Sequence, residues 1–272
     1  MKFKNLQVMF LSTVGSALLI TSASALVLFR GNFESANFSG WELEGADPSS
    51  IQVVTSPVRS GSYAAKFTLN RTDRLVANGK RAEVRKKSSF ANVGKEFWYG
   101  ISMYVPTYWA TDPSSAEILA QLHDRPDTVL GETWRSPQIS LGIQGEKWYL
   151  RNRWDPKPKT IGNDPRPEGN VNRFDLGPVT KGVWTDWVVH AKWSYGSDGV
   201  LEIWKNGVLV VKYNGPNAYN DQKSPYWKFG VYKPDWNKPD YGRSVVTSRT
   251  IYLDNVRFGD STSNYNQVNP AK

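Results

Sequence analysis

Apolar and polar side chains alternate through many short segments of this chain, most clearly in residues 226–232. In a β-strand, successive side chains point to opposite faces. The apolar members of this segment share one face and are expected to join a core: Trp227, Phe229 and Val231. The other face carries proton-handling and cationic groups beside a glycine that leaves room: Tyr226, Lys228, Gly230 and Tyr232.

Two earlier segments have the same character. The segment 81–85 places Arg81, Glu83 and Arg85 on one face of a strand. The segment 121–123 places Gln121 and His123 on one face, with the intervening leucine in the core. We expect the three strands to lie side by side and to line one groove. A surface ladder of ion pairs is the alternative interpretation of the first segment.

Further β-type runs separated by turn signals predict strands over much of the chain: 51–55, 63–69, 97–105, 117–123, 138–143, 147–154, 184–193, 201–205, 208–213 and 250–258. The sequence Asn206-Gly207 predicts a tight hairpin turn. Two long polar stretches, 155–177 and 233–249, are expected to form loops that wall the groove. With no amphipathic helix or internal repeat found, the pattern predicts an all-β fold, a two-sheet antiparallel sandwich of the β-jelly-roll type.

The N-terminus has the form of a secretory signal. Lys2 and Lys4 precede an apolar run, and Ala23-Ser-Ala25 is a cleavage signal. We therefore expect a signal peptide at residues 1–25, a single domain at 26–272, and secretion to an extracellular or periplasmic location. No stable membrane association is expected after removal of the signal, and a retained anchor is the alternative.

The net charge and the cysteine content limit the classes of function that the protein can have. The formal net charge is +9, and only two of the basic residues lie in the expected signal. An exported protein with a positive net charge is expected to bind polyanions. We expect an acidic polysaccharide as the partner and do not expect nucleic acid. The alternative is that the charge serves solubility alone. The chain has no cysteine, which excludes disulfides and thiol catalysis. No oligomeric partner is expected.

The three strands carry the groups that a β-elimination on a uronic acid requires. Arg81 and Gln121 can stabilise charge on the uronate carboxylate. His123 and Tyr232 can take or give a proton. Glycosidases need a carboxylate pair, and the sequence has no Glu-x-Asp-x-x-Glu arrangement on a strand. Serine hydrolases of the α/β class need a Gly-x-Ser-x-Gly turn, which is not found either. The second histidine, His190, lies in another predicted strand and is interpreted as structural.

The three segments resemble, in order, the signature strands of jelly-roll alginate lyases, which read R-[ST]-E-[LV]-R, Q-[IV]-H and Y-F-K-A-G-x-Y. The flanking segments are similar to a related group that includes glucuronan lyase and heparin lyase I. The resemblance spans residues 29–258. It implies a polysaccharide lyase that cleaves a polyuronate, with glucuronan or alginate expected and heparin-type chains less so, to give 4,5-unsaturated uronate ends.

Carried onto this sequence, the resemblance implies that Arg81 and Gln121 neutralise the carboxylate. His123 and Tyr232 become base and acid, with Tyr232 favoured as the acid or as both. The supporting and substrate-binding set is Glu83, Arg85, Lys228, Arg125 and Tyr226. Three positions depart from the family pattern and leave the substrate open: Ala82, Phe229 and Lys233-Pro234.

Similar jelly rolls bind a structural calcium through an early glutamate and an aspartate of the last strand. Glu34 and Asp254 occupy those places here. No cofactor is expected for catalysis itself. Two other functions stay open at this point: a non-catalytic carbohydrate-binding jelly roll, and a concanavalin-like glycoside hydrolase.

Overall fold

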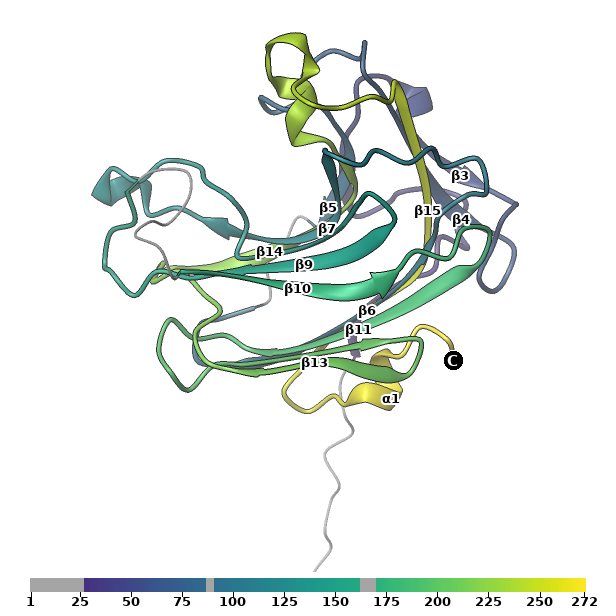
Figure 1. Cartoon of the computed structure of the whole chain (residues 1–272). Helices are drawn as coiled ribbons and strands as arrows, with labels where there is room; N and C mark the ends of the chain where they lie inside the picture. Colours follow the sequence, from purple (N-terminus) through teal and green to yellow (C-terminus); the bar gives the residue numbers. More distant parts are fainter. Residues whose placement is uncertain (1–26, 87–90, 162–169) are drawn as a thin grey trace, which may run out of the picture.

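A computed structural model describes residues 27–86, 91–161 and 170–272, and in these ranges the chain forms two antiparallel sheets packed face to face (Figure 1). One sheet has eight strands, in the order β13 (Val208–Asn214), β12 (Val200–Lys205), β11 (Trp184–Lys192), β6 (Glu96–Tyr104), β15 (Ser248–Asp260), β4 (Ala64–Asn70) and β3 (Ile51–Val54), with β1 (Val27–Gly31) paired to β15. The other has seven strands, in the order β10 (Val171–Pro178), β9 (Lys147–Arg153), β8 (Ile139–Gln144), β7 (Ala116–Arg125), β14 (Lys223–Tyr232), β5 (Arg81–Lys86) and β2 (Trp41–Glu44). The predicted all-β, two-sheet antiparallel architecture is confirmed.

Aromatic side chains join the two sheets. Trp148 of β9 and Trp187 of β11 are both fully buried and meet edge to face, with ring centroids 5.1 Å apart. Phe67 of β4 and Phe229 of β14 are also fully buried, with centroids 6.3 Å apart. Buried aromatic groups of this size dominate the energetics of a core. The apolar face predicted for residues 226–232 therefore points to the opposite sheet, and the polar face points away from it.

Tight turns follow the sequence signals closely. Asn206 and Gly207 connect β12 and β13 with φ angles of 50° and 85°. Positive φ at both positions is what a two-residue hairpin turn with the right twist requires. The predicted hairpin is confirmed.

One stretch predicted to be a loop contains a strand. The second half of the stretch 155–177 forms β10, the edge strand of the seven-stranded sheet. Val171 is exposed and Leu176 is buried, so only part of this strand packs on the core. Its apolar signal is diluted for that reason, and the strand was missed. The rest of the stretch includes residues 162–169, which lie outside the described residues.

The remaining elements are short. The described part of the chain has four 3-10 helices, η1 (Pro48–Ser50), η2 (Thr128–Leu130), η3 (Pro234–Asn237) and η4 (Pro239–Tyr241), and α1 (Tyr265–Val268) lies in the predicted polar tail. The chain segment 126–138, here called the η2 loop, follows β7, and the segment 233–247, the η3–η4 loop, follows β14. Because β7 and β14 are antiparallel neighbours, the two loops lie at opposite ends of the same strand pair (Figure 1).

Within the described ranges, none of the helices is long and apolar enough to cross a membrane. The expected signal peptide at residues 1–25 lies outside the described residues. Its division from a single domain at 26–272 stays a prediction.

Candidate active site

The three strands singled out from the sequence are neighbours in the seven-stranded sheet, with β14 between β5 and β7. The pairing register places Tyr226 beside His123, and Tyr232 beside Arg81. Between these rows, Lys228 lies opposite both Gln121 and Arg85. The predicted adjacency is confirmed. We call the face that carries these side chains, away from the other sheet, the site face.

Gly230 is required by the approach of two strands in the middle of the site. Its φ is +137°, and a Cβ there would lie 2.2 Å from the carbonyl oxygen of Ala82 and 2.7 Å from Cα of Glu83. No side chain fits in that space without moving backbone. The pairing of β14 with β7 is also irregular here, between Phe229 and Tyr232. The glycine therefore sets the local shape of β14 on which Tyr232 is placed.

A buried carboxylate lies at the centre of the site. Glu83 accepts hydrogen bonds from Nη1 of Arg81 at 3.2 Å and from Nε2 of Gln121, and it pairs with Nζ of Lys228 at 3.1 Å. Burial by itself would raise the pKa of Glu83, but Lys228 and Arg81 outweigh it and hold the pKa below its usual range. The ionised carboxylate thereby fixes the orientation of Arg81 and Gln121, the two expected neutralisers.

Glu44 of β2 extends this network. It pairs with Lys228 at 2.6 Å, with Arg81 at 3.4 Å and with Arg85 at 3.3 Å. Lys228 is 2% exposed and Glu83 is fully buried. Expected as substrate-binding residues, these two have almost no surface to offer a polymer in this structure; their contacts are those of supporting groups. Arg85, by contrast, is partly exposed and also pairs with Glu42.

His123 has one ring nitrogen committed to its neighbour. Its Nδ1 lies 3.1 Å from the carbonyl oxygen of Asp124 and 2.9 Å from that residue's Oδ1. A carbonyl and an ionised carboxylate can only accept hydrogen bonds, so Nδ1 carries the hydrogen. The neutral ring then has its lone pair on Nε2. Asp124 is itself fully buried, and its other oxygen lies 3.0 Å from Nε of Arg135.

Tyr226 forms the floor beside His123. The two rings stack with centroids 5.5 Å apart, and the guanidinium groups of Arg125 and Arg85 lie 5.4 Å and 5.8 Å from the tyrosine ring. Burial, and then the charge of Glu44, raise the pKa of Tyr226. It stays a neutral phenol, and its ring is buried against His123 and the two guanidinium groups.

Tyr232 lies at the other end of the site, under Arg81. The guanidinium of Arg81 is 4.6 Å from the centre of the tyrosine ring. Asn237 of the η3–η4 loop accepts a hydrogen bond from the amide of Lys80 at 2.6 Å and donates one from Nδ2 to the hydroxyl oxygen of Tyr232 at 2.9 Å. Burial raises the pKa of Tyr232, although Arg81 and Asn237 act in the opposite direction. The phenol is therefore protonated near neutral pH.

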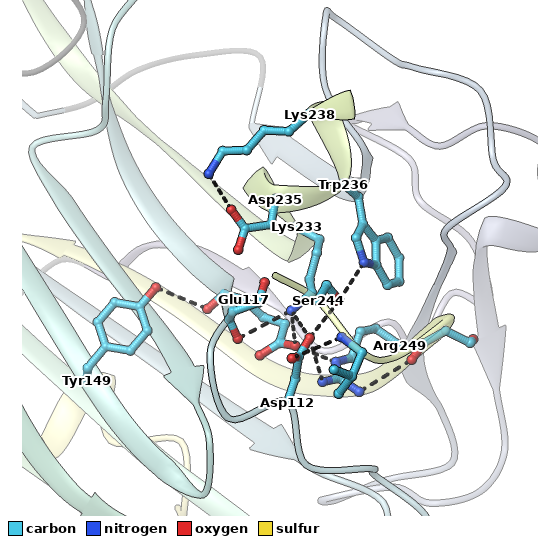
Figure 2. A network of polar contacts seen from close by, with 12 residues as sticks. Asp112, Glu117, Tyr149, Lys233, Asp235, Trp236, Lys238, Ser244 and Arg249 are labelled. Atoms are coloured by element: carbon cyan, nitrogen blue, oxygen red, sulfur yellow. Dashed lines mark hydrogen bonds and ion pairs between the residues drawn. The ribbon is translucent and has the colours of Figure 1, made fainter. Parts of the chain in front are cut away.

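The η3–η4 loop is tied down by a buried ion network next to Tyr232 (Figure 2). Lys233 is fully buried and its ammonium lies 2.7 Å from Asp112 and 2.8 Å from Glu117. Arg249 pairs with Glu117, and Ser244 donates to Asp112 at 2.7 Å. The family departure at Lys233 thus has a structural explanation: its cation anchors the loop that carries Asn237.

The site face continues as a cationic surface over β9 and β10. Gln121 lies opposite Ser140, Ser140 opposite Arg151, and Arg151 opposite Arg173, so one row crosses four strands. The two guanidiniums lie 5.4 Å and 4.5 Å from the ring of Tyr149. Burial, and then the charge of Arg151, lower the pKa of Arg173. Among the described residues, neither arginine forms an ion pair within 4 Å.

The residues expected to hold calcium lie on both sides of the turn 59–63. Glu34 accepts amide hydrogen bonds from Ser62 and Tyr63, and Asp254 accepts them from Arg59 at 2.9 Å and Ser60. Burial raises the pKa of Asp254 and the charge of Glu34 adds to the effect. Carboxylate oxygens are hard donors of the kind that calcium prefers, so these two residues are suitable calcium ligands. Calcium binding here stays a prediction.

A second acidic group lies against a cation of the chain itself. Oxygens of Asp127, Glu132 and Asp221 lie within 4.8 Å of one another. The guanidinium of Arg135 bonds Glu132 at 3.0 Å and also contacts Asp221. A cation therefore occupies this cluster without a metal.

The sequence interpretation missed four residues that contact the site: Asp124, Asn237, Glu44 and Trp134. Asp124 follows the second site strand directly, which is the one usable signal. Asn237 and Trp134 lie in the loops that follow β14 and β7, and Glu44 lies in β2, so the folding of two loops and the pairing of β2 with β5 bring them near the site. His190 lies in β11 of the other sheet, stacked on Trp98 and 3.0 Å from Glu202.

Comparison with known proteins agrees with this arrangement. A sequence model of the polysaccharide lyase family matches residues 33–257. No curated protein sequence gives a significant match. The endo-β-1,4-glucuronan lyase of the fungus Trichoderma reesei has a similar structure, with a TM-score of 0.74 and 21% identity over 90% of this chain and 99% of that chain.

Two further structures share the fold at lower similarity. Alginate lyase A1-II′, a member of polysaccharide lyase family 7, has a TM-score of 0.53 and 18% identity over 82% of this chain and 95% of that chain. Cip1, a cellulose-induced protein, has a TM-score of 0.52 and 14% identity over 85% of this chain and 96% of that chain. At these identities the likeness establishes the jelly-roll architecture.

Proposed function

The chain belongs to the polysaccharide lyase family, and from this premise we propose that it cleaves a uronate-containing polysaccharide, glucuronan or alginate, by β-elimination. Family membership favours elimination over the two alternatives left by the sequence, a non-catalytic binding module and a glycoside hydrolase. Similarity to a glucuronan lyase and to alginate lyases supports the two named substrates.

One observation carries the mechanism: Arg81 and Gln121 are held by the buried carboxylate of Glu83. Abstraction of the proton next to a uronate carboxylate places negative charge on that carboxylate. A preoriented guanidinium and amide N–H stabilise this charge without reorganising during the reaction. Because Glu83 already fixes both groups, the partly exposed Arg81 meets the substrate carboxylate in place, whereas Gln121, which is 2% exposed like Lys228, supports it from within the buried network.

We assign the two proton transfers to His123 and Tyr232. The lone pair on Nε2 of His123 can accept the α-proton, since Nδ1 is committed to Asp124. Tyr232 is protonated near neutral pH and can donate its hydrogen to the leaving glycosidic oxygen. The hydroxyl oxygen already accepts from Asn237, so its own hydrogen is free for the substrate and the phenolate that forms is stabilised.

Charge on the site face supports an anionic polymer. Among the described residues, Arg125, Arg151 and Arg173 have no ion-pair partner. Arg125 lies on β7, which carries His123, and Arg151 and Arg173 lie on β9 and β10, beyond β8 in the same sheet. Cations without a counter-ion attract a polyanion and raise its association rate. We also propose that the protein is secreted, on the strength of the signal at residues 1–25, and acts as a monomer.

The proposal is tested by incubating the purified mature chain with glucuronan, polymannuronate, polyguluronate, heparin, heparan sulfate and pectate. A rise in ultraviolet absorbance from a 4,5-unsaturated uronate on glucuronan or an alginate block is the expected result. New reducing ends without that absorbance would indicate hydrolysis and would overturn the proposal.

A further inference from the structure

A large aromatic side chain is left in solvent beside His123. Trp134, in the η2 loop, is 60% exposed. Tryptophan is usually among the most buried residues on average. Its ring centroid lies 5.7 Å from that of His123, with the planes at 67°. The imidazole therefore has Tyr226 stacked on it and Trp134 edge to face with it.

The exposure of Trp134 is not a consequence of a loose loop. The next residue, Arg135, has a fully buried side chain, with Nη1 3.0 Å from Glu132 and Nε 3.0 Å from Asp124. Glu132 in turn accepts an amide hydrogen bond from Asp127 at 2.7 Å. Removing one partner of a buried ion network is strongly destabilising, so this network fixes the backbone around position 134.

The same network ties the loop to distant parts of the chain. Arg135 also contacts Asp221, and its guanidinium lies 4.4 Å from the ring of Tyr219. Glu132 accepts a hydrogen bond from the amide of Thr160 at 2.5 Å. The loop is thus braced from two other segments while one apolar ring is kept outside. A rigid, exposed aromatic at a binding surface supplies contact area with little entropy to lose.

We propose that Trp134 is a stacking platform for a pyranose ring of the substrate, the one bound next to the scissile linkage on the His123 side. The axial C–H bonds of a pyranose are weakly positive and fit the negative face of an indole ring. Arg125, at the end of β7 and over Tyr226, supplies a cation for the carboxylate of a sugar in this region. This assignment rests on the proposed function and adds a binding subsite to it.

The test compares Trp134→Ala with Trp134→Phe, which keeps an aromatic face. Tyr195→Ala is the matched control, since Tyr195 is an exposed aromatic in the segment after β11 of the other sheet. On the polymer that the wild type cleaves, KM should rise about ten-fold in Trp134→Ala, a loss typical of one stacking platform. The kcat value should stay within about two-fold, since an interaction equal in ground and transition states changes KM alone. Trp134→Phe should recover most of the loss.

A second readout does not depend on turnover. Migration of each variant, and of the wild type, is measured in native gels that contain glucuronan, alginate, heparin or pectate. The wild type should be retarded by a uronan, Trp134→Ala much less, and Tyr195→Ala as the wild type. A wild type that is retarded but makes no unsaturated product would defeat the proposed elimination and leave the platform standing. Unchanged KM and retardation in Trp134→Ala, or a wild type retarded by none of these polymers, would overturn the platform.

Discussion

Nδ1 of His123 lies 2.9 Å from a carboxylate oxygen of Asp124 and 3.1 Å from the carbonyl oxygen of the same residue. The carbonyl oxygen can only accept a hydrogen bond, so Nδ1 carries the hydrogen, and the carboxylate beside Nδ1 favours the same tautomer of the expected base. Asp124 is the first residue after the Gln-Leu-His motif. Asp124 is buried away from any substrate and is a positioning residue: one oxygen lies beside His123, and the other lies 3.0 Å from Nε of Arg135, which holds the η2 loop.

Asp124→Asn keeps the shape of the side chain but replaces one acceptor oxygen with an N–H group. We expect kcat to fall about ten- to hundred-fold, as for other groups that orient a functional histidine, with KM little changed. A merely structural role would lower activity in proportion to folded protein, so circular dichroism and thermal unfolding are measured alongside. In a His123→Ala background the substitution should have no further effect on the rate; a full additional loss would contradict the positioning role.

Asn237→Ala removes the hydrogen bond that Tyr232 accepts. That bond favours the phenolate and lowers the pKa of Tyr232, against the upward shift caused by burial. Without it the pKa rises further. If Tyr232 is the acid, activity is lost only when the phenol ionises, so the alkaline limb of the pH–rate profile should move to higher pH.

The profile of kcat/KM between neutral and alkaline pH measures this shift. Lys238→Ala, in the same loop but paired only with Asp235 among the described residues, is the control. An alkaline limb that stays in place, or moves to lower pH, would show that Asn237 does not act on Tyr232.

The alternation of side chains along strands allowed part of the site to be predicted from the sequence. Residues Arg81, Gln121, His123 and Tyr232 alternate with core residues, and alternation alone places them on one face. A shared face does not reveal how deeply a side chain is enclosed, so the burial of Glu83 and Lys228 could not be predicted in this way, and their part in substrate binding stays a prediction. Here Lys228 is enclosed in part by its ion pair with Glu44 of β2, a strand that was not predicted from the sequence.

The contacts that loop residues make with the site could not be predicted from strand alternation. Asn237 reaches Tyr232 because a buried network around Lys233 holds the η3–η4 loop (Figure 2). Trp134 reaches His123 because Arg135 fixes the η2 loop. These networks join residues more than 80 positions apart, and neither periodicity nor turn chemistry encodes such pairings.

Arg151→Ala and Arg173→Ala test the extension of the site face. Each should raise KM for the cleaved polymer by about ten-fold, the size of a charge-assisted hydrogen bond, and leave kcat nearly unchanged. The effect should shrink at high ionic strength. Lys212→Ala, an exposed cation on β13 of the other sheet, is the control. Equal effects of Lys212→Ala and the two arginine variants would indicate general charge attraction instead of a subsite.

Calcium is expected to stabilise the fold through Glu34 and Asp254. A ligand that binds only the native state raises the melting temperature with its concentration. The wild type should therefore melt higher in calcium than in chelator, and Glu34→Gln should lose most of this difference. Glu146→Gln, an exposed acid in the β8–β9 turn, should behave as the wild type. Equal melting temperatures of the wild type in calcium and in chelator would show that calcium does not stabilise the fold.

The central claim is that His123 and Tyr232 perform a β-elimination, and initial rates of unsaturated-uronate formation test it most directly. On glucuronan and alginate, the wild type should generate ultraviolet absorbance. His123→Ala and Tyr232→Phe, folded as judged by circular dichroism, should each be slower by about 10²- to 10⁴-fold, the usual contribution of a positioned acid or base. Near-wild-type rates in either variant would contradict the assignment, and a wild type that forms no double bond on either polymer would contradict the claim as a whole.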